Sequence, residues 1–504
     1  MAASLPPCLL APPFNDASRA HLRRLDAGWA RLLRGEKPPS VLQRVGPATL
    51  PATDRDVDVV YAGGGVALLH ALAMQKRGWQ TLLFDRRAVG QTHREWNITR
   101  RELDALVQAG LFDWPALETV VAREYEGGFI QFHDPHGPPI HVELPHVLDL
   151  ALDATALLTL ARRHYEAAGG IVWEGQSFEQ AWLATDGLPR VVVQLRDAQS
   201  QPQRIGAKLL VNGMGALSPL SLALAGDGLP FDGVCPTVGT VARGFAAGEV
   251  DPTVGEILLT LDGAKDERQF VWEGFPAGGD AFTTYLFYYD ITAGRADNPH
   301  SLIELYVDYF ERLATYKRPG PDFAHLRPVY GFIPARHHVD GPAPQQARTA
   351  RGLLSVGDAA ARQNPLTFTG FGSFVRHLPR ATAQLDELLR NDALDAETLA
   401  TLSAAQQNLA PLWVMARFLS PRGYPDSVNS ILRDFARVMD EIGPKRSAAF
   451  FRDETALLDY LAIKLRMARH RPKVFGEALA TLGARGLAQW GEDIVRWGAT
   501  QSSQ

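Results

Sequence analysis

The sequence predicts an α/β fold: a nucleotide-binding β-α-β unit comes first, a mixed or antiparallel β-sheet region is inserted after it, and a helical region ends the chain. Three observations predict this order. From residue 56 to residue 85, an apolar run, a glycine cluster, a helical stretch and a second apolar run follow one another. Residues 171–300 alternate as strands do. From Arg376 onward strand signals nearly vanish and helical patterns take over.

These patterns divide the chain into five regions. They are an N-terminal helical extension (1–54), the first part of the nucleotide-binding domain (55–235), a β-rich substrate domain (236–340), the distal part of the nucleotide-binding domain (341–385) and a helical C-terminal region (386–504).

Local signals support the separate elements. In the extension, leucines and Trp29 fall on one helical face that needs a partner. The string TRRE at 99–102 is a capping box that predicts a helix. Residues 269–290 (QFVWEGFPAGGDAFTTYLFYYD) predict an aromatic hairpin with its turn at 276–279, and 204–212 (RIGAKLLVN) predicts one buried strand that enters a glycine turn.

Composition excludes several classes of protein. The chain has 504 residues, is 46% hydrophobic and carries a net charge of −5, so it lacks the basic excess that nucleic-acid binding requires. Its two cysteines predict neither a disulfide framework nor a metal site. We find no signal peptide and no uncharged stretch long enough to span a membrane, and we therefore expect a cytoplasmic protein.

The glycine cluster after the first predicted strand is typical of a Rossmann-type dinucleotide turn. Such a turn needs small residues for tight packing and a glycine where the backbone approaches the pyrophosphate. The register AGGGVA at 62–67 makes Gly64 the middle glycine, flanked by Gly63 and Gly65. Asp85 ends the next strand, where an acid accepts hydrogen bonds from the adenosine ribose. An acid at that place predicts FAD or NAD, with these three glycines and Asp85 in contact with it.

A second glycine-rich element favours FAD. Residues 351–373 (RGLLSVGDAAARQNPLTFTGFGS) resemble the distal FAD motif of the flavin monooxygenase and geranylgeranyl reductase superfamily. The resemblance implies that Asp358 binds the ribityl chain. It also implies a helix N-terminus that faces the flavin and stabilises the negative charge of its reduced form. The expected cofactor-binding residues are Gly357, Asp358, Thr369, Gly370 and Gly372.

Further strings resemble one branch of that superfamily, the CruA- and CruP-type lycopene cyclases. They are REWNITRREL from Arg94, CPTVGTVARGF from Cys235, the aromatic hairpin string and NPLTFTGFGSFVRHLPR from Asn364. The resemblance implies an FAD-dependent enzyme that closes the ψ end groups of lycopene into β-type rings. Its first string places Arg94 among the cofactor-binding residues.

The implied reaction needs an acid and electron-rich walls. A proton adds to the terminal double bond, a second alkene attacks the tertiary cation, and a neighbouring proton is lost without net electron transfer. Reduced FAD would stabilise the cation or carry a proton, with NAD(P)H as external reductant. The aromatic rings of the predicted hairpin would present their π faces to the cation.

Three carboxylates are candidates for the acid. If Phe275 pairs with Phe282 across the hairpin turn, Glu273 and Asp290 share the face of those two rings. An acid in apolar surroundings has a raised pKa and can donate a proton near neutrality. Asp290 also lies near where plant-type lycopene cyclases have an acidic FLEET string, which this sequence lacks. Glu95 is the third candidate, because its loop is expected to approach the flavin.

A polyene substrate implies contact with a membrane surface. Leucines at 457, 458, 461 and 465 stand beside basic residues at 464, 466, 469, 471 and 473, a pattern that suits an anionic surface. Two alternatives remain open. One is a flavin-dependent monooxygenase or halogenase, although the halogenase string WxWxIP is absent. The other is a CruP-like, carotenoid-binding paralog without catalysis.

Overall fold

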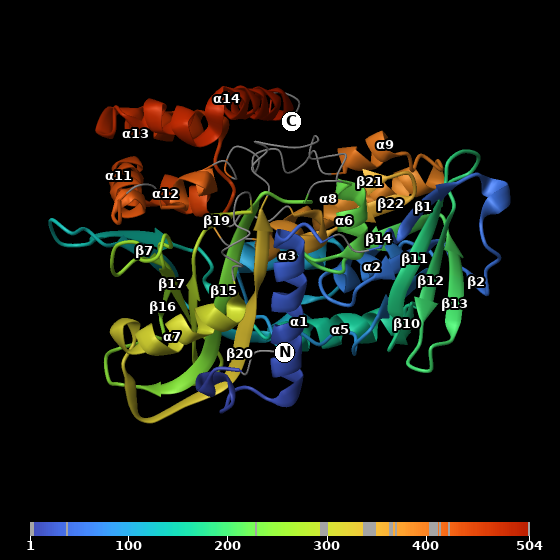
Figure 1. Ribbon diagram of the computed structural model, residues 1–504, viewed down its shortest axis with the longest axis horizontal. Helices are drawn as coiled ribbons and strands as arrows, with labels where there is room; N and C mark the ends of the chain where they lie inside the picture. The colour runs from blue at the N-terminus through green and yellow to red at the C-terminus, as the bar shows by residue number, and fades with distance from the viewer. Residues whose placement is uncertain are drawn as a thin grey trace.

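The computed structural model describes the chain except for residues 1–4, 37–38, 227–228, 293–300, 336–348, 362–365, 368–369, 403–411, 413–414, 422–423 and 502–504. Two sheet-based halves lie side by side, with the C-terminal helices stacked over one of them (Figure 1). The mixed α/β class with a helical C-terminal region is confirmed.

The first half is built on a six-stranded sheet that is parallel except at one edge. Its strands are, in spatial order, β10 (Ile171–Glu174), β4 (Thr81–Asp85), β3 (Val59–Ala62), β14 (Leu209–Asn212), β22 (Leu353–Ser355) and β21 (Thr349–Ala350). Side chains alternate between the two faces of β3, and both faces are buried. Val59 and Tyr61 pack with helices, whereas Val60 and Ala62 pack with a second sheet.

Helices cover one face of this sheet and a five-stranded sheet covers the other. The helices are α2 (Ala67–Lys76), α3 (Arg100–Gln108), α4 (Trp114–Glu118), α5 (Ala154–Ala167), α8 (Gly370–Arg390) and α9 (Ala396–Thr401). Helix α6 (Pro219–Ala225) packs instead on the side of the second sheet. The covering sheet has the order β1 (Leu42–Val45), β11 (Ser177–Ala184), β12 (Val191–Arg196), β13 (Pro202–Ala207) and β2 (Arg55–Asp56). The segment predicted as one strand at 204–212 thus divides into β13 and β14, which belong to different sheets.

The second half is a large, mostly antiparallel sheet. It consists of β19 (Asp290–Ile291), β15 (Gly233–Phe245), β18 (Phe282–Phe287), β17 (Val271–Pro276), β16 (Val254–Leu259), β7 (Gly127–Phe132) and β8 (Ile140–Pro145), with β20 (Pro319–Ala335) paired to β15. A small sheet of β5 (Trp96–Ile98), β9 (Leu150–Leu152) and β6 (Val121–Glu124) lies apart from it. The large sheet includes the hairpin at 127–145, so its limits differ from the predicted 236–340.

Helices sandwich the large sheet. On one face lie α1 (Asp16–Leu33) and α7 (Leu302–Tyr316), and on the other lie α11 (Ser427–Ile442), α12 (Pro444–Phe451), α13 (Leu457–His470) and α14 (Val474–Gln501). Trp29 of α1 stacks on Phe231 and Phe332, so the predicted apolar face of the extension has its partner in this half. Capping boxes begin α1 at Asn15 and, as predicted, α3 at Thr99.

Candidate functional site

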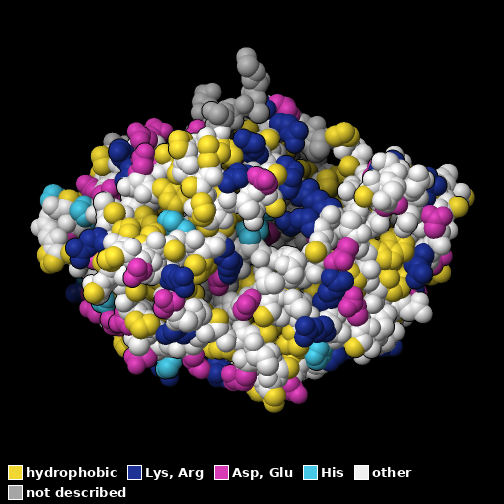
Figure 2. Space-filling model, turned by 90° about the horizontal axis from the view of Figure 1, so that it is seen from below, with side chains coloured by type: hydrophobic (Ala, Val, Ile, Leu, Met, Phe, Trp, Pro, Cys, Tyr) yellow, Lys and Arg dark blue, Asp and Glu magenta, His cyan; other side chains and the backbone are white. Residues whose placement is uncertain are grey.

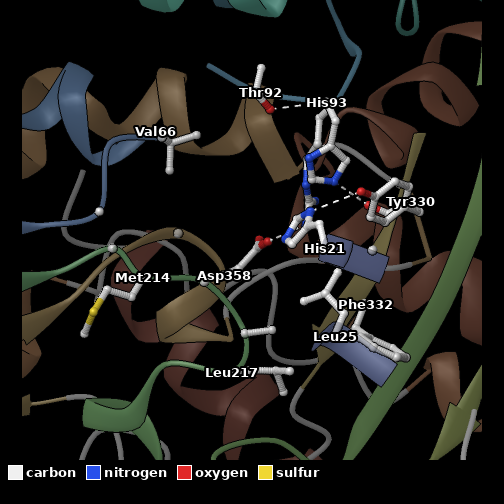
Figure 3. A pocket seen from close by; sticks show the side chains of 18 of the residues that line it. His21, Leu25, Val66, Thr92, His93, Met214, Leu217, Tyr330, Phe332 and Asp358 are labelled. Carbon is white, nitrogen blue, oxygen red and sulfur yellow. Dashed lines mark hydrogen bonds and ion pairs between the residues drawn. The ribbon is translucent and has the colours of Figure 1, made fainter. Parts of the chain in front are cut away.

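A cavity of about 920 Å³ lies between the two halves, where the carboxyl ends of β3, β4 and β14 face the large sheet. Ligands of open α/β sheets bind at this edge. The face of the molecule seen from below is hollowed near its centre, and Lys and Arg side chains gather beside the hollow (Figure 2). Inside the cavity, residues of α1, of the 86–97 loop and of β20 point toward one another (Figure 3).

The glycine turn opens directly onto this cavity, but its register differs from the predicted one. Gly63 has φ +103°, and a Cβ there would lie 2.5 Å from the carbonyl oxygen of Gly213. A Cβ on Gly65 would have no atom within 4 Å. Gly63 is therefore the tight-turn glycine and Gly65, not Gly64, is the residue where a pyrophosphate can approach. The Rossmann pattern has a third glycine three residues after the second, where the helix packs on the strand. In this chain that position is Leu68, which is fully buried in α2.

Asp85 supports this turn from the end of β4. Its Oδ2 accepts a hydrogen bond from the Gly64 backbone N–H at 2.8 Å, and its Oδ1 accepts one from the Arg87 N–H at 2.8 Å. The carboxylate lines the cavity, in the position of a ribose-binding acid. The turn, the acid and the start of α2 thus have the arrangement that a dinucleotide needs.

The distal motif meets the first motif across the cavity. Asp358 forms an ion pair with Arg94 at 3.1 Å (Figure 3), and both line the cavity together with Gly357. Gly370 begins α8 and also lines it. Gly372 does not line the cavity, because it packs against Glu102, whose Oε1 would lie 2.7 Å from a Cβ at that position. Thr369 lies outside the described residues.

Glu95 is committed to an ion pair. It contacts the Arg327 guanidinium group and lines the cavity. The next residue, Trp96, stacks on Phe371 at 4.1 Å and so connects this loop with α8.

Glu273 is the predicted acid that fits the cavity best. It lies on β17, is 4% exposed and lines the cavity together with Phe275 and Tyr285. Among the described residues, its Oε1 has no hydrogen-bond partner. Burial raises the pKa of the Glu273 carboxyl well above its ordinary value and so favours its protonated form.

Asp290 does not share this site, because the register of the aromatic hairpin differs from the expectation. Phe282 pairs with Pro276 and Phe275 pairs with Thr283, a shift of one residue. Since side chains alternate along a strand, Phe282 faces away from Glu273. Asp290 lies in β19, paired with Val234, and is not among the residues that line the cavity.

The sequence reasoning missed one wall of the cavity, which α1 supplies. His21 Nδ1 lies 3.1 Å from the Tyr330 hydroxyl group, and the His93 ring stacks on Tyr330 at 4.5 Å (Figure 3). Arg24 and Leu25 line the same wall. The amphipathic pattern of α1 signalled a packing partner but carried no sign of the cavity.

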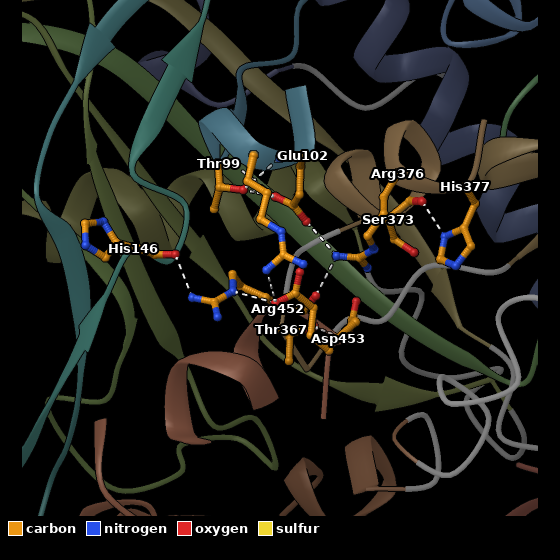
Figure 4. A network of polar contacts seen from close by, with 11 residues as sticks. Thr99, Glu102, His146, Thr367, Ser373, Arg376, His377, Arg452 and Asp453 are labelled. Atoms are coloured by element: carbon orange, nitrogen blue, oxygen red, sulfur yellow. Dashed lines mark hydrogen bonds and ion pairs between the residues drawn. The ribbon is translucent and has the colours of Figure 1, made fainter. Parts of the chain in front are cut away.

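A charge network behind the cavity holds α3, α8 and the C-terminal helices together (Figure 4). Arg376 donates to Glu102 Oε1 at 2.8 Å and to the Arg452 carbonyl oxygen at 2.7 Å. Thr99 caps α3 and donates to Glu102 Oε2 at 3.0 Å. Burial raises the pKa of Glu102, and the charge of Arg376 opposes this shift. Thr367 donates to Asp453 at 3.2 Å in the same network.

We expect Arg376→Met to destabilise the protein by about 3–5 kcal/mol, because it leaves the buried Glu102 carboxyl without its charged partner. Urea unfolding measures this change. Arg380→Met, at an exposed position of the same helix, is the matched control and should change stability by less than about 0.5 kcal/mol. Equal effects of the two substitutions would contradict the role of the network.

We expect Glu273→Gln to stabilise the protein progressively relative to wild type as pH rises above the ordinary glutamate value. A carboxyl with a raised folded-state pKa contributes stability below its unfolded pKa, and this contribution is lost as pH rises through the folded pKa. The difference should grow by up to about 1.4 kcal/mol per pH unit. Unfolding midpoints of both proteins from about pH 5 to about pH 9 measure it. Glu126→Gln, exposed, should show no such trend.

Comparisons with known proteins bear on the fold. No protein-family model matches the chain, and neither does any curated protein. A geranylgeranyl bacteriochlorophyll reductase-like protein from Thermoplasma acidophilum matches with TM-score 0.60 and 17% identity, over 85% of this chain and 99% of that one. Halogenase PltM, in complex with phloroglucinol and FAD, matches with TM-score 0.54 and 14% identity, over 89% and 93%.

p-Nitrophenol 4-monooxygenase PnpA from Pseudomonas putida DLL-E4 matches with TM-score 0.53 and 16% identity, over 80% of this chain and 99% of that one. Each alignment spans both halves of the present chain, since each covers at least 80% of it. The chain thus has the fold of these three proteins.

Proposed function

We propose that the protein is an FAD-dependent lycopene cyclase that closes the ψ end groups of an acyclic carotenoid into β-type rings by proton-initiated, non-redox chemistry. The observation that carries the proposal is the buried Glu273 carboxyl, whose pKa burial raises, beside aromatic side chains and in the same cavity as the glycine turn. The resemblance to the CruA- and CruP-type strings gives the substrate class.

FAD fits the cavity on structural grounds. Gly65 leaves open space where the pyrophosphate would lie, and Asp85 stands at the ribose position. Arg94 and Asp358 stand near the start of α8, where the flavin end would lie. Bound FAD in its reduced form would supply a negative charge close to a developing cation, with NAD(P)H as the external reductant.

The chain's own residues would manage the proton and the cation. Glu273 would donate its proton to the terminal double bond, and the second alkene would then attack the tertiary cation. Phe275 and Tyr285, which line the cavity with it, would present π faces to that cation. Loss of a neighbouring proton completes the ring, and a proton returned to Glu273 restores the acid.

A hydrocarbon substrate would reach the protein from a membrane, and the C-terminal apolar surface supports such docking. We define this surface by six exposed side chains of α13 and α14, Leu458, Leu461, Leu465, Phe475, Leu479 and Val495. They account for six of the ten large exposed hydrophobic side chains recorded in the described residues, and the two helices form the outermost layer (Figure 1). Such clustering marks an interaction surface.

Charge favours an anionic lipid surface as the partner. Arg469 continues the leucine stripe of α13, and Arg485 lies on α14; both are exposed, and neither has a carboxylate within ion-pair distance among the described residues. Two basic residues predicted for this surface turn inward instead. Arg471 is ion-paired with Asp434, and Lys464 lies over aromatic rings, where burial lowers its pKa to about 7. Among the described residues, no helix has the length and apolar character to cross a bilayer.

Expression in a lycopene-accumulating bacterium tests the cyclase proposal. We expect cyclised carotenoid of unchanged mass with the wild type, and Glu273→Gln should lower its formation at least about 100-fold, because the acid is lost. Chromatography and mass spectrometry measure the product. Asp290→Asn, a buried acid outside the cavity, should retain activity. Unchanged lycopene with folded, FAD-bound wild type would favour a monooxygenase, a halogenase or a non-catalytic paralog instead.

Vesicle flotation tests the C-terminal apolar surface. The double variant Leu458→Ser, Leu465→Ser should bind phosphatidylglycerol-containing vesicles at least about tenfold more weakly, since burying each leucine contributes about 1.5–3 kcal/mol. Leu188→Ser is the matched control, because the Leu188 side chain is 75% exposed but lies outside α13 and α14. This variant should bind the vesicles as the wild type does. Unchanged binding of the double variant would overturn the proposal, as would sedimentation showing that this surface instead joins two copies of the chain.

A further inference from the structure

Three arginines at the wall of the cavity form no ion pair with any described residue. Arg24 on α1 and Arg86 and Arg87 after β4 all line the cavity. Within the described part of the chain, no carboxylate lies within ion-pair distance of any of the three guanidinium groups. Arg94, which also lines the cavity, differs in this respect, because it forms an ion pair with Asp358.

These arginines lie close enough to affect one another and their neighbours. Burial, followed by the charges of Arg87 and Arg24, lowers the pKa of Arg86, and Asp85 opposes the shift. Burial, His93 and the same arginines lower the pKa of His21 to about 3. His21 is therefore neutral, and the three exposed guanidinium groups stand together at the cavity wall. A cluster of like charges beside a cavity attracts an anionic ligand.

The position of Arg24 is set by a rigid helix. Asp26 of α1 accepts hydrogen bonds from Ser301 Oγ at 2.7 Å and from the Leu302 backbone N–H at 2.8 Å, at the start of α7. Trp29 stacks on Phe332 at 4.8 Å. The arginines thus come from two separate elements that meet at the cavity, and the N-terminal extension is part of the cavity wall.

We propose that Arg24, Arg86 and Arg87 form an anion subsite that binds phosphate groups of a nucleotide. The inference rests on the proposed nucleotide-binding function of the cavity. Guanidinium groups match phosphate oxygens in geometry and charge. The phosphates belong either to the diphosphate of FAD or to a reduced nicotinamide dinucleotide that docks at the mouth, where the 2′-phosphate of NADPH would distinguish it from NADH.

The test uses full-length Arg24→Gln, Arg86→Gln and the double variant. Arg23→Gln is the matched control, because Arg23 is the exposed neighbour on α1 and does not line the cavity. Quenching of flavin fluorescence gives the FAD dissociation constant over a range of NaCl concentrations. Anaerobic stopped-flow absorbance gives the rates of flavin reduction by NADPH and by NADH.

We expect the double variant to raise the FAD dissociation constant about tenfold or more and to weaken its salt dependence, if the FAD diphosphate is the ligand. Unchanged FAD binding with slower flavin reduction by NADPH or NADH would assign the subsite to the second nucleotide, and a larger effect with NADPH would assign it to the 2′-phosphate. Variants that match Arg23→Gln in both measurements would overturn the proposal. A wild type that binds FAD but forms no cyclised carotenoid would overturn only the cyclase proposal.

Discussion

The buried contact between Glu102 and Arg376 fixes the geometry on which the cavity depends. It joins α3 to α8, and through the Arg452 carbonyl oxygen it holds the C-terminal helices to both. A carboxyl that is 3% exposed remains in the interior only with hydrogen bonds and a charged partner, and this requirement leaves little freedom for the three elements. The stack of Trp96 on Phe371, which borders the cavity, follows from the same placement.

Charge is unevenly distributed within the cavity. Two ion pairs border it, Arg94 with Asp358 and Glu95 with Arg327, whereas Glu273 lies among aromatic side chains, where burial raises its pKa. Arg24, Arg86 and Arg87, which form no ion pair with any described residue, line the wall that α1 helps to form. A ligand with phosphates at one end and a flat ring system at the other would match this distribution, and an apolar substrate would fit only beside Glu273.

Several parts of the site could be predicted from the sequence because they depend on local order. A strand, a glycine turn, a helix and a strand ending in an acid place Gly63, Gly65 and Asp85 together in any β-α-β unit. The capping box at Thr99 could likewise be predicted, because it depends on only four consecutive residues. The middle glycine was misplaced by one residue, because three adjacent glycines fit two registers and only the approach of Gly63 to Gly213 distinguishes them.

The sequence by itself determined the α/β class, the nucleotide turn and its acid, the distal motif and the candidacy of Glu273. Tertiary structure alone decided that Glu273 lines the cavity and Asp290 does not, because a one-residue shift in the β17–β18 register puts them on opposite faces of the hairpin. It also decided that Glu95 is paired and that α1 forms a cavity wall. Each of these depends on contacts between residues far apart in the chain, and no local pattern specifies such contacts.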